Sequence, residues 1–314
     1  MINKTSKIIV TGAAGLVGMN LITLLLEQGY QQILAIDKHQ HNLGILKQLH
    51  PQVTCTAADL SLSGDWVNEF SDAAVLIQLH AQITGKTADE FVTNNVQATH
   101  QVLAAAQKHQ IPYLIHASSS VVNSIADDDY TNTKREQEAL VSQSGIPHVI
   151  LRPTLMFGWF DPKHFGWLSR FMEKMPIFPI PGDGRFMRQP LYNRDFCRVI
   201  IHCLENQPTN KAYDLVGQEQ IDYIDIIYAI KRVKKCKTAV VCIPYSLFHV
   251  LLSVYGLFSK KPPFTQHQLK ALTAGDEFTG VDLKRTFGID PTAFDAAILE
   301  TFTNPKYKDI VLQR

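Results

Sequence analysis

The chain has 314 residues, 46% of them hydrophobic, and its 30 basic and 29 acidic side chains leave a formal net charge of +1. This length and apolar content allow one large α/β unit or two lobes that share an interface. The balanced charge, without a long run of lysine or arginine, argues against a nucleic-acid-binding surface. We interpret the densest basic stretch, residues 231–237, as the end of an amphipathic helix, where cations meet the C-terminal dipole.

The five cysteines are odd in number and form no C-x-x-C pair, and the twelve histidines show no ligand spacing. This pattern argues against a disulfide framework and against a zinc site. It predicts buried thiols in a reducing compartment, and hence a cytoplasmic protein. The cysteines are Cys55, Cys197, Cys203, Cys236 and Cys242.

Two segments bear on targeting and membranes. The N-terminal sequence enters a strand within a few residues, so we expect no signal peptide. The apolar run "LFHVLLSVYGLF" at residues 247–258 is shorter than the about 20 residues that span a bilayer. We therefore expect no membrane span and a buried helix here, with contact to a membrane surface as the alternative.

The first half of the chain alternates strands and helices. Strands are expected at residues 6–10, 32–37, 53–59, 74–81, 113–119 and 148–154. Between them, helices are expected after the first strand up to Gly29, before Pro51, near residues 65–70, from about Asp89 to His109, and around Tyr130. The strands are nearly continuous apolar runs, as in a sheet covered on both faces. The sequence therefore predicts an α/β fold with a doubly wound parallel sheet, the Rossmann arrangement.

After residue 155 the alternation loosens. Residues 156–184 are rich in aromatics, prolines and glycines, which suits a smaller substrate-binding lobe. The segment "KAYDLVG" at residues 211–217 is predicted to return to the main sheet as a strand. We therefore expect a dinucleotide-binding domain of residues 1–155 joined by 190–217, and an interleaved C-terminal substrate lobe of residues 156–189 and 218–314.

A glycine-rich loop, "TGAAGLVG", joins the first strand to the first helix. Gly12 permits the tight turn, Gly15 lets the backbone approach a pyrophosphate, and Gly18 lets the helix pack close to the strand. Amides at the start of this helix then face the phosphates. The predicted dinucleotide-binding residues of this segment are Gly12, Gly15, Leu16, Val17 and Gly18.

Asp37 ends the second strand about 20 residues after the loop, where an acid binds the adenosine ribose hydroxyls. Its charge would repel a 2′-phosphate, so the sequence favours NAD over NADP. NADP stays possible because Lys38 is adjacent.

The stretch "DDDYTNTKREQEAL" holds Tyr130 and Lys134, four residues apart and so on one face of a helix. Of the ten tyrosines, Tyr130 alone has a lysine at this spacing. The preceding strand ends in "ASSS", which delivers serines to the carboxyl edge of the sheet, where ligands bind. A phenol with a pKa near 10 needs a close cation to transfer protons near neutrality.

Together these motifs resemble the short-chain dehydrogenase/reductase superfamily, and within its extended branch the NAD-dependent epimerase/dehydratase family, over most of the chain. The resemblance implies that Asp59 and Leu60 contact adenine. It places Leu79 and Ala81 in the family's H-L-A-A element, from which Gln78 and His80 depart, and Asn95 at the family's asparagine.

The resemblance also implies catalytic roles. Tyr130 would be the acid/base, and the Lys134 ammonium would lower its pKa and hold the nicotinamide ribose. Ser119 would hydrogen-bond the reacting oxygen, because its distance from the following "VVN" fits the family pattern best.

The segment "GDGRFMRQPLYNRD" resembles the family's nucleotide-sugar element, with Arg188 placed to grip the diphosphate and Asp195 placed to cap the next helix. The alternative for Arg188 is a surface arginine paired with a carboxylate. Two features depart from the family: Leu155 stands where asparagine often holds substrate, and the loop from Ser119 to Tyr130 is short.

The resemblance therefore implies an NAD-dependent epimerase/dehydratase-type oxidoreductase, acting on a nucleotide sugar through hydride transfer and a keto intermediate. A one-way ketone reductase or hydroxyl dehydrogenase would use the same residues. A further alternative is an atypical dinucleotide-binding relative with an assembly or redox-sensing role, similar to the 39-kDa accessory subunit of respiratory complex I. The family also implies a homodimer through the helices at residues 89–109 and 131–143.

Overall fold

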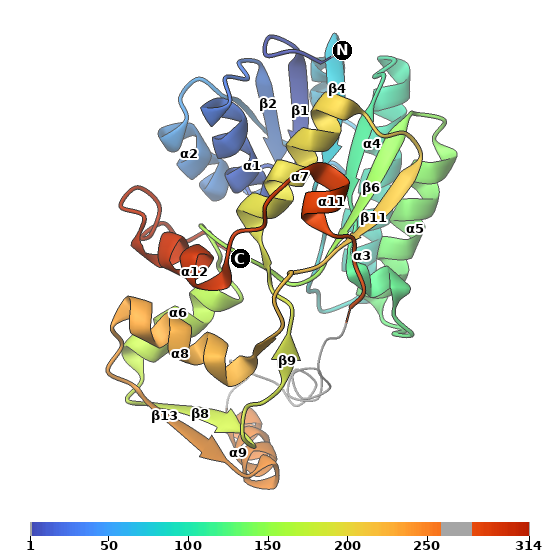
Figure 1. Ribbon diagram of the computed structural model, residues 1–314. Helices are drawn as coiled ribbons and strands as arrows, with labels where there is room; N and C mark the ends of the chain where they lie inside the picture. Colours follow the sequence, from blue (N-terminus) through green and yellow to red (C-terminus); the bar gives the residue numbers. More distant parts are fainter. Residues whose placement is uncertain (1, 259–277, 314) are drawn as a thin grey trace.

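The structure is a computed structural model that describes residues 2–258 and 278–313 (Figure 1). Its centre is a sheet of seven strands in the order β11-β6-β5-β4-β1-β2-β3. Every neighbouring pair in this sheet is parallel, which confirms the predicted fold class. The strands are β1 (Lys7–Thr11), β2 (Ile33–Asp37), β3 (Thr54–Ala57), β4 (Ala73–Gln78), β5 (Leu114–Ala117), β6 (His148–Pro153) and β11 (Lys211–Leu215).

Helices cover both faces of the sheet, because alternate residues of each strand point to opposite sides. On β1, Ile8 and Val10 join one buried cluster and Ile9 joins the other. The first cluster is covered by α1 (Leu16–Glu27), α2 (Gln40–Leu49) and α7 (Asn193–Asn206). The second is covered by the 3₁₀ helix η1 (Asp65–Phe70), α4 (Ala98–Lys108) and α5 (Asp129–Gln143) (Figure 1).

The helix predicted from about Asp89 to His109 is a succession of three helical segments. It comprises α3 (Ala88–Phe91), a π-helical segment η2 (Val92–Gln97) and α4. The wider π turn turns the fully buried Asn95 side chain toward the loop that follows β4, where it binds Gln82. A local π turn at such a point is typical of a functional region of a helix.

The second lobe lies below the sheet in Figure 1 and is built around an aromatic cluster that includes Phe157, Phe165 and Phe294. Its helices are α6 (Phe165–Lys174), α8 (Tyr223–Lys234), α9 (Tyr245–Phe258) and α12 (Phe294–Thr303). Its strand pairs are β8 (Ile177–Pro181) with β13 (Ala239–Ile243), and β9 (Met187–Arg188) with β12 (Ile221–Asp222). A third pair, β7 (Met156–Phe157) with β10 (Leu191–Tyr192), connects this lobe to the sheet.

Two sequence predictions at the boundary of the lobes are confirmed. β11 returns to the main sheet and pairs with β6. The basic stretch from residue 231 closes α8, with Lys231, Arg232 and Lys234 in its last turn. Cations there interact favourably with the helix dipole.

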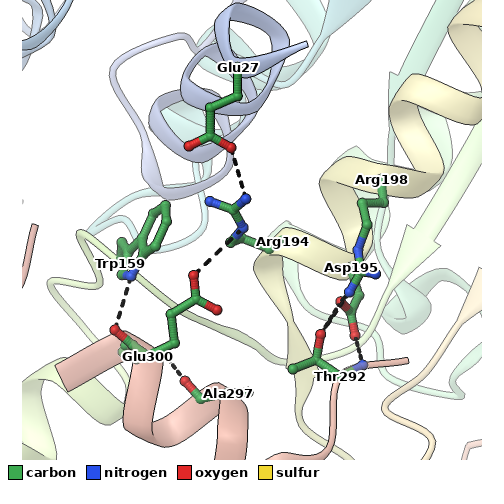
Figure 2. A network of polar contacts seen from close by, with 9 residues as sticks. Glu27, Trp159, Arg194, Asp195, Arg198, Thr292, Ala297 and Glu300 are labelled. Atoms are coloured by element: carbon green, nitrogen blue, oxygen red, sulfur yellow. Dashed lines mark hydrogen bonds and ion pairs between the residues drawn. The ribbon is translucent and has the colours of Figure 1, made fainter. Parts of the chain in front are cut away.

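Arg194 links the two lobes (Figure 2). Its guanidinium lies 2.9 Å from Glu27 of α1 and 3.9 Å from Glu300 of α12. The Trp159 indole donates to the backbone carbonyl of Glu300 at 3.2 Å. These contacts dock α12 against α1 and α7 on one face of the main sheet.

The prediction that Asp195 caps the helix is wrong. The N-cap of α7 is Tyr192, which makes no side-chain cap bond. The Asp195 carboxylate instead pairs with Arg198 and accepts hydrogen bonds from the backbone nitrogen and hydroxyl of Thr292, both at 2.8 Å (Figure 2). The Asp195 carboxylate is buried, and Thr292 of the C-terminal segment gives it two hydrogen-bond donors. It therefore does not serve as the cap of α7.

Two burial predictions need correction. Cys197 and Cys203 are buried in α7, but Cys55 and Cys236 are only partly buried and Cys242 on β13 is exposed. In the first turns of α9, Phe248 is buried whereas Leu247 and Val250 are about half exposed. This helix packs on β8 with one side, so an apolar sequence did not produce a fully buried element. Within residues 2–258 and 278–313, the structure contains no helix with the length and apolar character of a membrane span.

Candidate functional site

A cavity of about 550 Å³ lies at the carboxyl ends of the sheet strands. Ligands of open α/β sheets bind at this edge. The cavity brings together most of the residues that the sequence singled out. Those that line it are Gly12, Gly15, Leu16, Val17, Asp37, Asp59, Leu60, Leu79, Ala81, Ser119 and Tyr130.

The glycine loop shows why two of its glycines are required. Gly12 has φ +66°, and a Cβ there would lie 2.6 Å from the backbone nitrogen of His80. Both the left-handed conformation and the close approach demand glycine. Gly18 lies outside the cavity lining; a Cβ there would lie 2.4 Å from the Ala13 carbonyl oxygen, so it serves the packing of α1 against the loop.

Asp37 connects the second strand to this loop. Its Oδ2 accepts from the Ala14 amide at 3.0 Å, and its Oδ1 accepts from the His39 amide at 3.0 Å. Each carboxylate oxygen keeps a further lone pair toward the cavity. Two ribose hydroxyls can therefore bind Asp37 without displacing its backbone partners, and the residues present fit a dinucleotide.

Asp59 and Lys38 supply charge at the same end of the cavity. Partial burial works to raise the pKa of Asp59, but hydrogen bonds from Ser61 and the charge of Lys38 hold it below its usual value. Lys38 donates from Nζ to Asn94 Oδ1 at 2.5 Å. This end of the cavity therefore offers an ionised carboxylate and a lysine that has a partner on η2.

Tyr130 lies in the first turn of α5, whose N-cap Asp128 accepts from the Thr131 amide at 2.9 Å. Burial raises the pKa of the Tyr130 phenol, and a hydrogen bond with the Ser119 side chain opposes that shift. The family resemblance predicts that Lys134 lowers this pKa. In the structure the net direction is upward, because burial is the largest influence.

Lys134 is fully buried and does not line the cavity. Its Nζ donates to the Ala117 carbonyl at 3.0 Å and to Gln137 Oε1 at 2.7 Å. Burial lowers the pKa of Lys134 to about 7, although Glu138 acts in the opposite direction. Ala117, at the end of β5, lines the cavity, so its carbonyl connects the buried ammonium to the cavity wall.

Gln137, which is not among the predicted site residues, holds Lys134 in place. Its Nε2 donates to Thr99 Oγ1 at 2.8 Å and to the Asn95 carbonyl at 3.1 Å. Its position three residues after Lys134, on the same helix face, was the available signal. Asn95, outside the cavity lining, accepts from the Gln82 amide at 2.6 Å and donates to the Gln82 carbonyl at 3.1 Å.

His80, a departure from the family pattern, is also part of the cavity wall. Its Nδ1 lies 2.9 Å from Thr11 Oγ1. Burial, together with the charges of Lys134 and Lys38, lowers the pKa of His80 to about 3. The imidazole is therefore neutral at physiological pH, and it contributes hydrogen-bonding nitrogens to the wall of the cavity.

Arg188 is not brought to the cavity lining. It lies on β9, where it pairs with Ile221 of β12, and its charge opposes the burial that raises the pKa of Tyr223. The next residue, Gln189, accepts from the Thr154 hydroxyl through its carbonyl at 3.1 Å. Thr154 and Leu155 line the cavity in its place.

Comparison with known proteins agrees with this geometry. The profile of the NAD dependent epimerase/dehydratase family matches residues 8–215. A dTDP-glucose 4,6-dehydratase from Actinoplanes sp. is 23% identical over 249 residues, 67% of this chain and 76% of that protein. The 4-hydroxy-2-methyl-3-oxo-4-farnesyl-3,4-dihydroquinoline-1-oxide ketoreductase of Stigmatella aurantiaca is 23% identical over 258 residues, 75% of each chain.

Among solved structures, the UDP-glucuronic acid 4-epimerase from Bacillus cereus in complex with NAD is similar at 26% identity and a TM-score of 0.67. The similarity covers 76% of this chain and 87% of that one. The matched profile spans the sheet strands, the glycine loop, Asp37 and the Tyr130 helix. The chain thus belongs to the NAD dependent epimerase/dehydratase family.

Proposed function

We propose that the protein interconverts a secondary alcohol and a ketone, with Tyr130 transferring the proton. The placement of the Tyr130 phenol and the Ser119 hydroxyl in the wall of the same cavity as Asp37 and the glycine loop carries the proposal. NAD, the cofactor of the family, accepts a hydride from the alcohol carbon when bound, or returns it in reduced form to the ketone carbon.

The residues of the cavity would divide the remaining work. The Ser119 hydroxyl would hold the reacting oxygen within reach of the phenol. Because burial raises its pKa, Tyr130 stays protonated at neutral pH and would give its proton to a ketone oxygen in the reducing direction. Lys134 fixes the Ala117 carbonyl, and so the backbone that leads into Ser119. Contact of Lys134 with the nicotinamide ribose stays a prediction.

The same proton transfer serves several overall reactions. An epimerase reduces the keto intermediate from its other face, a dehydratase eliminates water from it, and a reductase releases the product. The names dTDP-glucose 4,6-dehydratase and UDP-glucuronic acid 4-epimerase support a nucleotide sugar. Arg188, although outside the cavity lining, would then be the proposed ligand of the diphosphate. The name of the Stigmatella relative supports one-way reduction of an apolar ketone.

The test of this proposal is the Tyr130→Phe variant. We expect it to bind NAD like the unmodified protein and to lose turnover by about 10²–10⁴-fold, the usual contribution of a positioned proton donor. Tyr228→Phe, on the exposed side of α8, is the matched control and should keep full activity. Near-normal turnover by Tyr130→Phe would show that another group transfers the proton.

The second candidate is a binding protein with an assembly or redox-sensing role. It is favoured by the position of Lys134, which does not line the cavity. It predicts that NAD co-purifies and that neither nucleotide sugars nor ketones are converted. Conversion that depends on Tyr130 rejects this candidate.

We also propose that the protein acts in the cytoplasm as a homodimer. The helices expected to form the dimer, at residues 89–109 and 131–143, pack side by side on one face of the sheet (Figure 1). Sedimentation equilibrium tests the homodimer, and a monomer at all accessible concentrations would reject it.

A further inference from the structure

The cavity has two chemically different ends, which the order of the strands separates. Gly12, Asp37 and Asp59 follow the neighbouring strands β1, β2 and β3 and form the polar, adenosine-binding end. The other end lies at the carboxyl ends of β4, β5 and β6. Since neighbouring strands are only about 5 Å apart, residues that follow β4 and β6 flank the Ser119 and Tyr130 side chains that follow β5.

Polar residues such as Gln82, Ser118 and Thr154 line this second end together with five apolar side chains, and we call the five apolar ones the apolar wall. Ile83 follows β4, Val121 follows Ser119, and Leu155 with Met156 follows β6. Phe278 completes the wall. Ile83 and Leu155 are 49% and 39% exposed, so these side chains face open space and not the packed core.

Backbone contacts hold the apolar wall in place. The Leu155 carbonyl accepts from the Leu191 amide at 2.8 Å, and the Phe278 amide donates to Gln189 Oε1 at 2.9 Å. The Asn95 side chain binds both backbone groups of Gln82, next to Ile83. A preformed apolar surface beside a few directed polar groups is typical of a site for an apolar small molecule.

The charged residues near the apolar wall have defined partners. The Asp161 carboxylate accepts from the backbone amides of Lys163, His164 and Gly166 at 2.8 to 3.0 Å. Lys163 Nζ donates to Thr84 Oγ1 at 3.5 Å. A nucleotide sugar would bring two phosphate charges here, and charged groups bind poorly against apolar side chains.

We infer that the substrate is an apolar ketone, or the matching secondary alcohol, whose hydrocarbon body lies against Ile83, Val121, Leu155, Met156 and Phe278. The inference rests on the proposed function, since Tyr130 and Ser119 supply the chemistry. In the reducing direction the carbonyl carbon gains a hydride from reduced NAD, and the carbonyl oxygen takes the phenol proton. The products are a secondary alcohol and oxidised NAD, and the phenolate regains its proton from solvent.

The experiment measures binding separately from turnover. Equilibrium dialysis of the protein loaded with oxidised NAD compares 5α-androstan-3-one and 2-dodecanone with UDP-glucose and dTDP-glucose. Oxidised NAD cannot reduce a ketone, so the ketones report binding alone. It can oxidise an alcohol, so a sugar nucleotide counts as retained whether it is recovered unchanged or as a product. We expect both ketones, and neither sugar nucleotide, to be retained. Turnover is then followed separately with reduced NAD.

Two variants test the apolar wall directly. Leu155→Asn and Ile83→Asn place an amide against the hydrocarbon and should weaken ketone binding by about 10-fold or more. Leu299→Asn makes the same kind of change at an exposed position of α12 and should leave ketone binding unchanged. NAD binding should be unchanged in all three variants, which shows that they fold.

The possible outcomes separate this inference from the proposed function. Sugar nucleotides that bind and are turned over by the unmodified protein, but not by Tyr130→Phe, leave the proposed function standing and overturn the apolar substrate. Ketones that bind in a Leu155-dependent way but are never reduced leave the apolar site standing and overturn the oxidoreductase. Retention of neither class overturns the inference.

Discussion

Asp37 accepts a hydrogen bond from the backbone amide of Ala14, with 3.0 Å between Oδ2 and the amide nitrogen. This bond joins the end of β2 to the glycine loop that follows β1. The acid therefore shapes the loop and also faces the cavity, where it is 8% exposed. One side chain thus supports the local structure and also lines the cavity, so we expect it to influence the choice of cofactor.

We expect Asp37→Asn to weaken NAD binding by about 10- to 100-fold. The amide removes the charge that strengthens hydrogen bonds from the ribose, and its NH₂ group must face either a backbone donor or the ribose hydroxyls. NADP binding should fall less, because the repulsion of a 2′-phosphate disappears. Titration with both nucleotides measures the change, and exposed Asp65→Asn is the control. An unchanged preference for NAD would contradict this role.

The fold could be predicted from the sequence because its determinants are local. Continuous apolar strands, helical spacing between them and the glycine loop each occupy a few consecutive residues, and together they require a covered parallel sheet. Asp37 could also be assigned, since its distance from the loop is fixed by one β-α-β unit.

A second prediction concerns the ion pair between Glu138 on α5 and Arg152 on β6. Both carboxylate oxygens are engaged, at 2.9 Å from Nε and 2.6 Å from the second guanidinium nitrogen. The side chains are only 12% and 22% exposed. Glu138→Ala leaves a partly buried guanidinium without this partner, so we expect the free energy of unfolding to fall by about 2–4 kcal/mol. Urea denaturation measures the loss.

The matched control is the surface pair of Lys4 and Glu205, separated by 3.2 Å with both side chains nearly half exposed. Solvent screens this pair, so Glu205→Ala should change the free energy of unfolding by about 0–1 kcal/mol. Equal losses in the two variants would mean that burial does not strengthen the Glu138 pair.

A third prediction tests the docking of the C-terminal segment through Asp195 and Thr292. Thr292→Val removes the hydroxyl donor but keeps the backbone donor, and should lower the free energy of unfolding by about 1 kcal/mol. Asp195→Ala removes both bonds and the pair with Arg198, and should lower it by about 3–5 kcal/mol. Faster tryptic cleavage at exposed Lys284 would report the same loosening.

Thr303→Val is the control for this pair, because its hydroxyl donates to the Leu299 carbonyl on the exposed side of α12. Its effect should stay within about 0.5 kcal/mol. Two results together would mean that other contacts dock the segment. Thr292→Val and Thr303→Val would lower the free energy of unfolding by the same small amount, and Asp195→Ala would lower it by less than about 1 kcal/mol.

The features that the sequence could not predict depend on contacts between distant segments. Asp195 looks like a helix cap because acids are common in a first turn, whereas its actual partner Thr292 is 97 residues away. Arg188 matches a family motif, yet the pairing of β9 with β12 sets its position. Contact of Lys134 with the cofactor stays a prediction, while the bond of its Nζ to the Ala117 carbonyl joins α5 to the end of β5, 17 residues away.

The last prediction concerns pH and Lys134, whose pKa burial lowers to about 7 from the model-peptide value of 10.5. Between these two values the unfolded chain keeps a proton that the folded protein has released. The unfolded state therefore binds more protons, and the free energy of unfolding rises with pH across this window. Below about pH 7 both states are protonated, and this lysine contributes no slope.

We expect the difference in free energy of unfolding between the unmodified protein and Lys134→Met to grow by ~3 kcal/mol from about pH 6 to about pH 9. Urea denaturation at each pH measures it, and the subtraction cancels the other titrating groups. Lys108→Met, at the exposed end of α4, is the control and should run parallel to the unmodified protein. A difference that stays flat for Lys134→Met would mean that the ammonium keeps its proton when buried, held by the Ala117 carbonyl and Gln137.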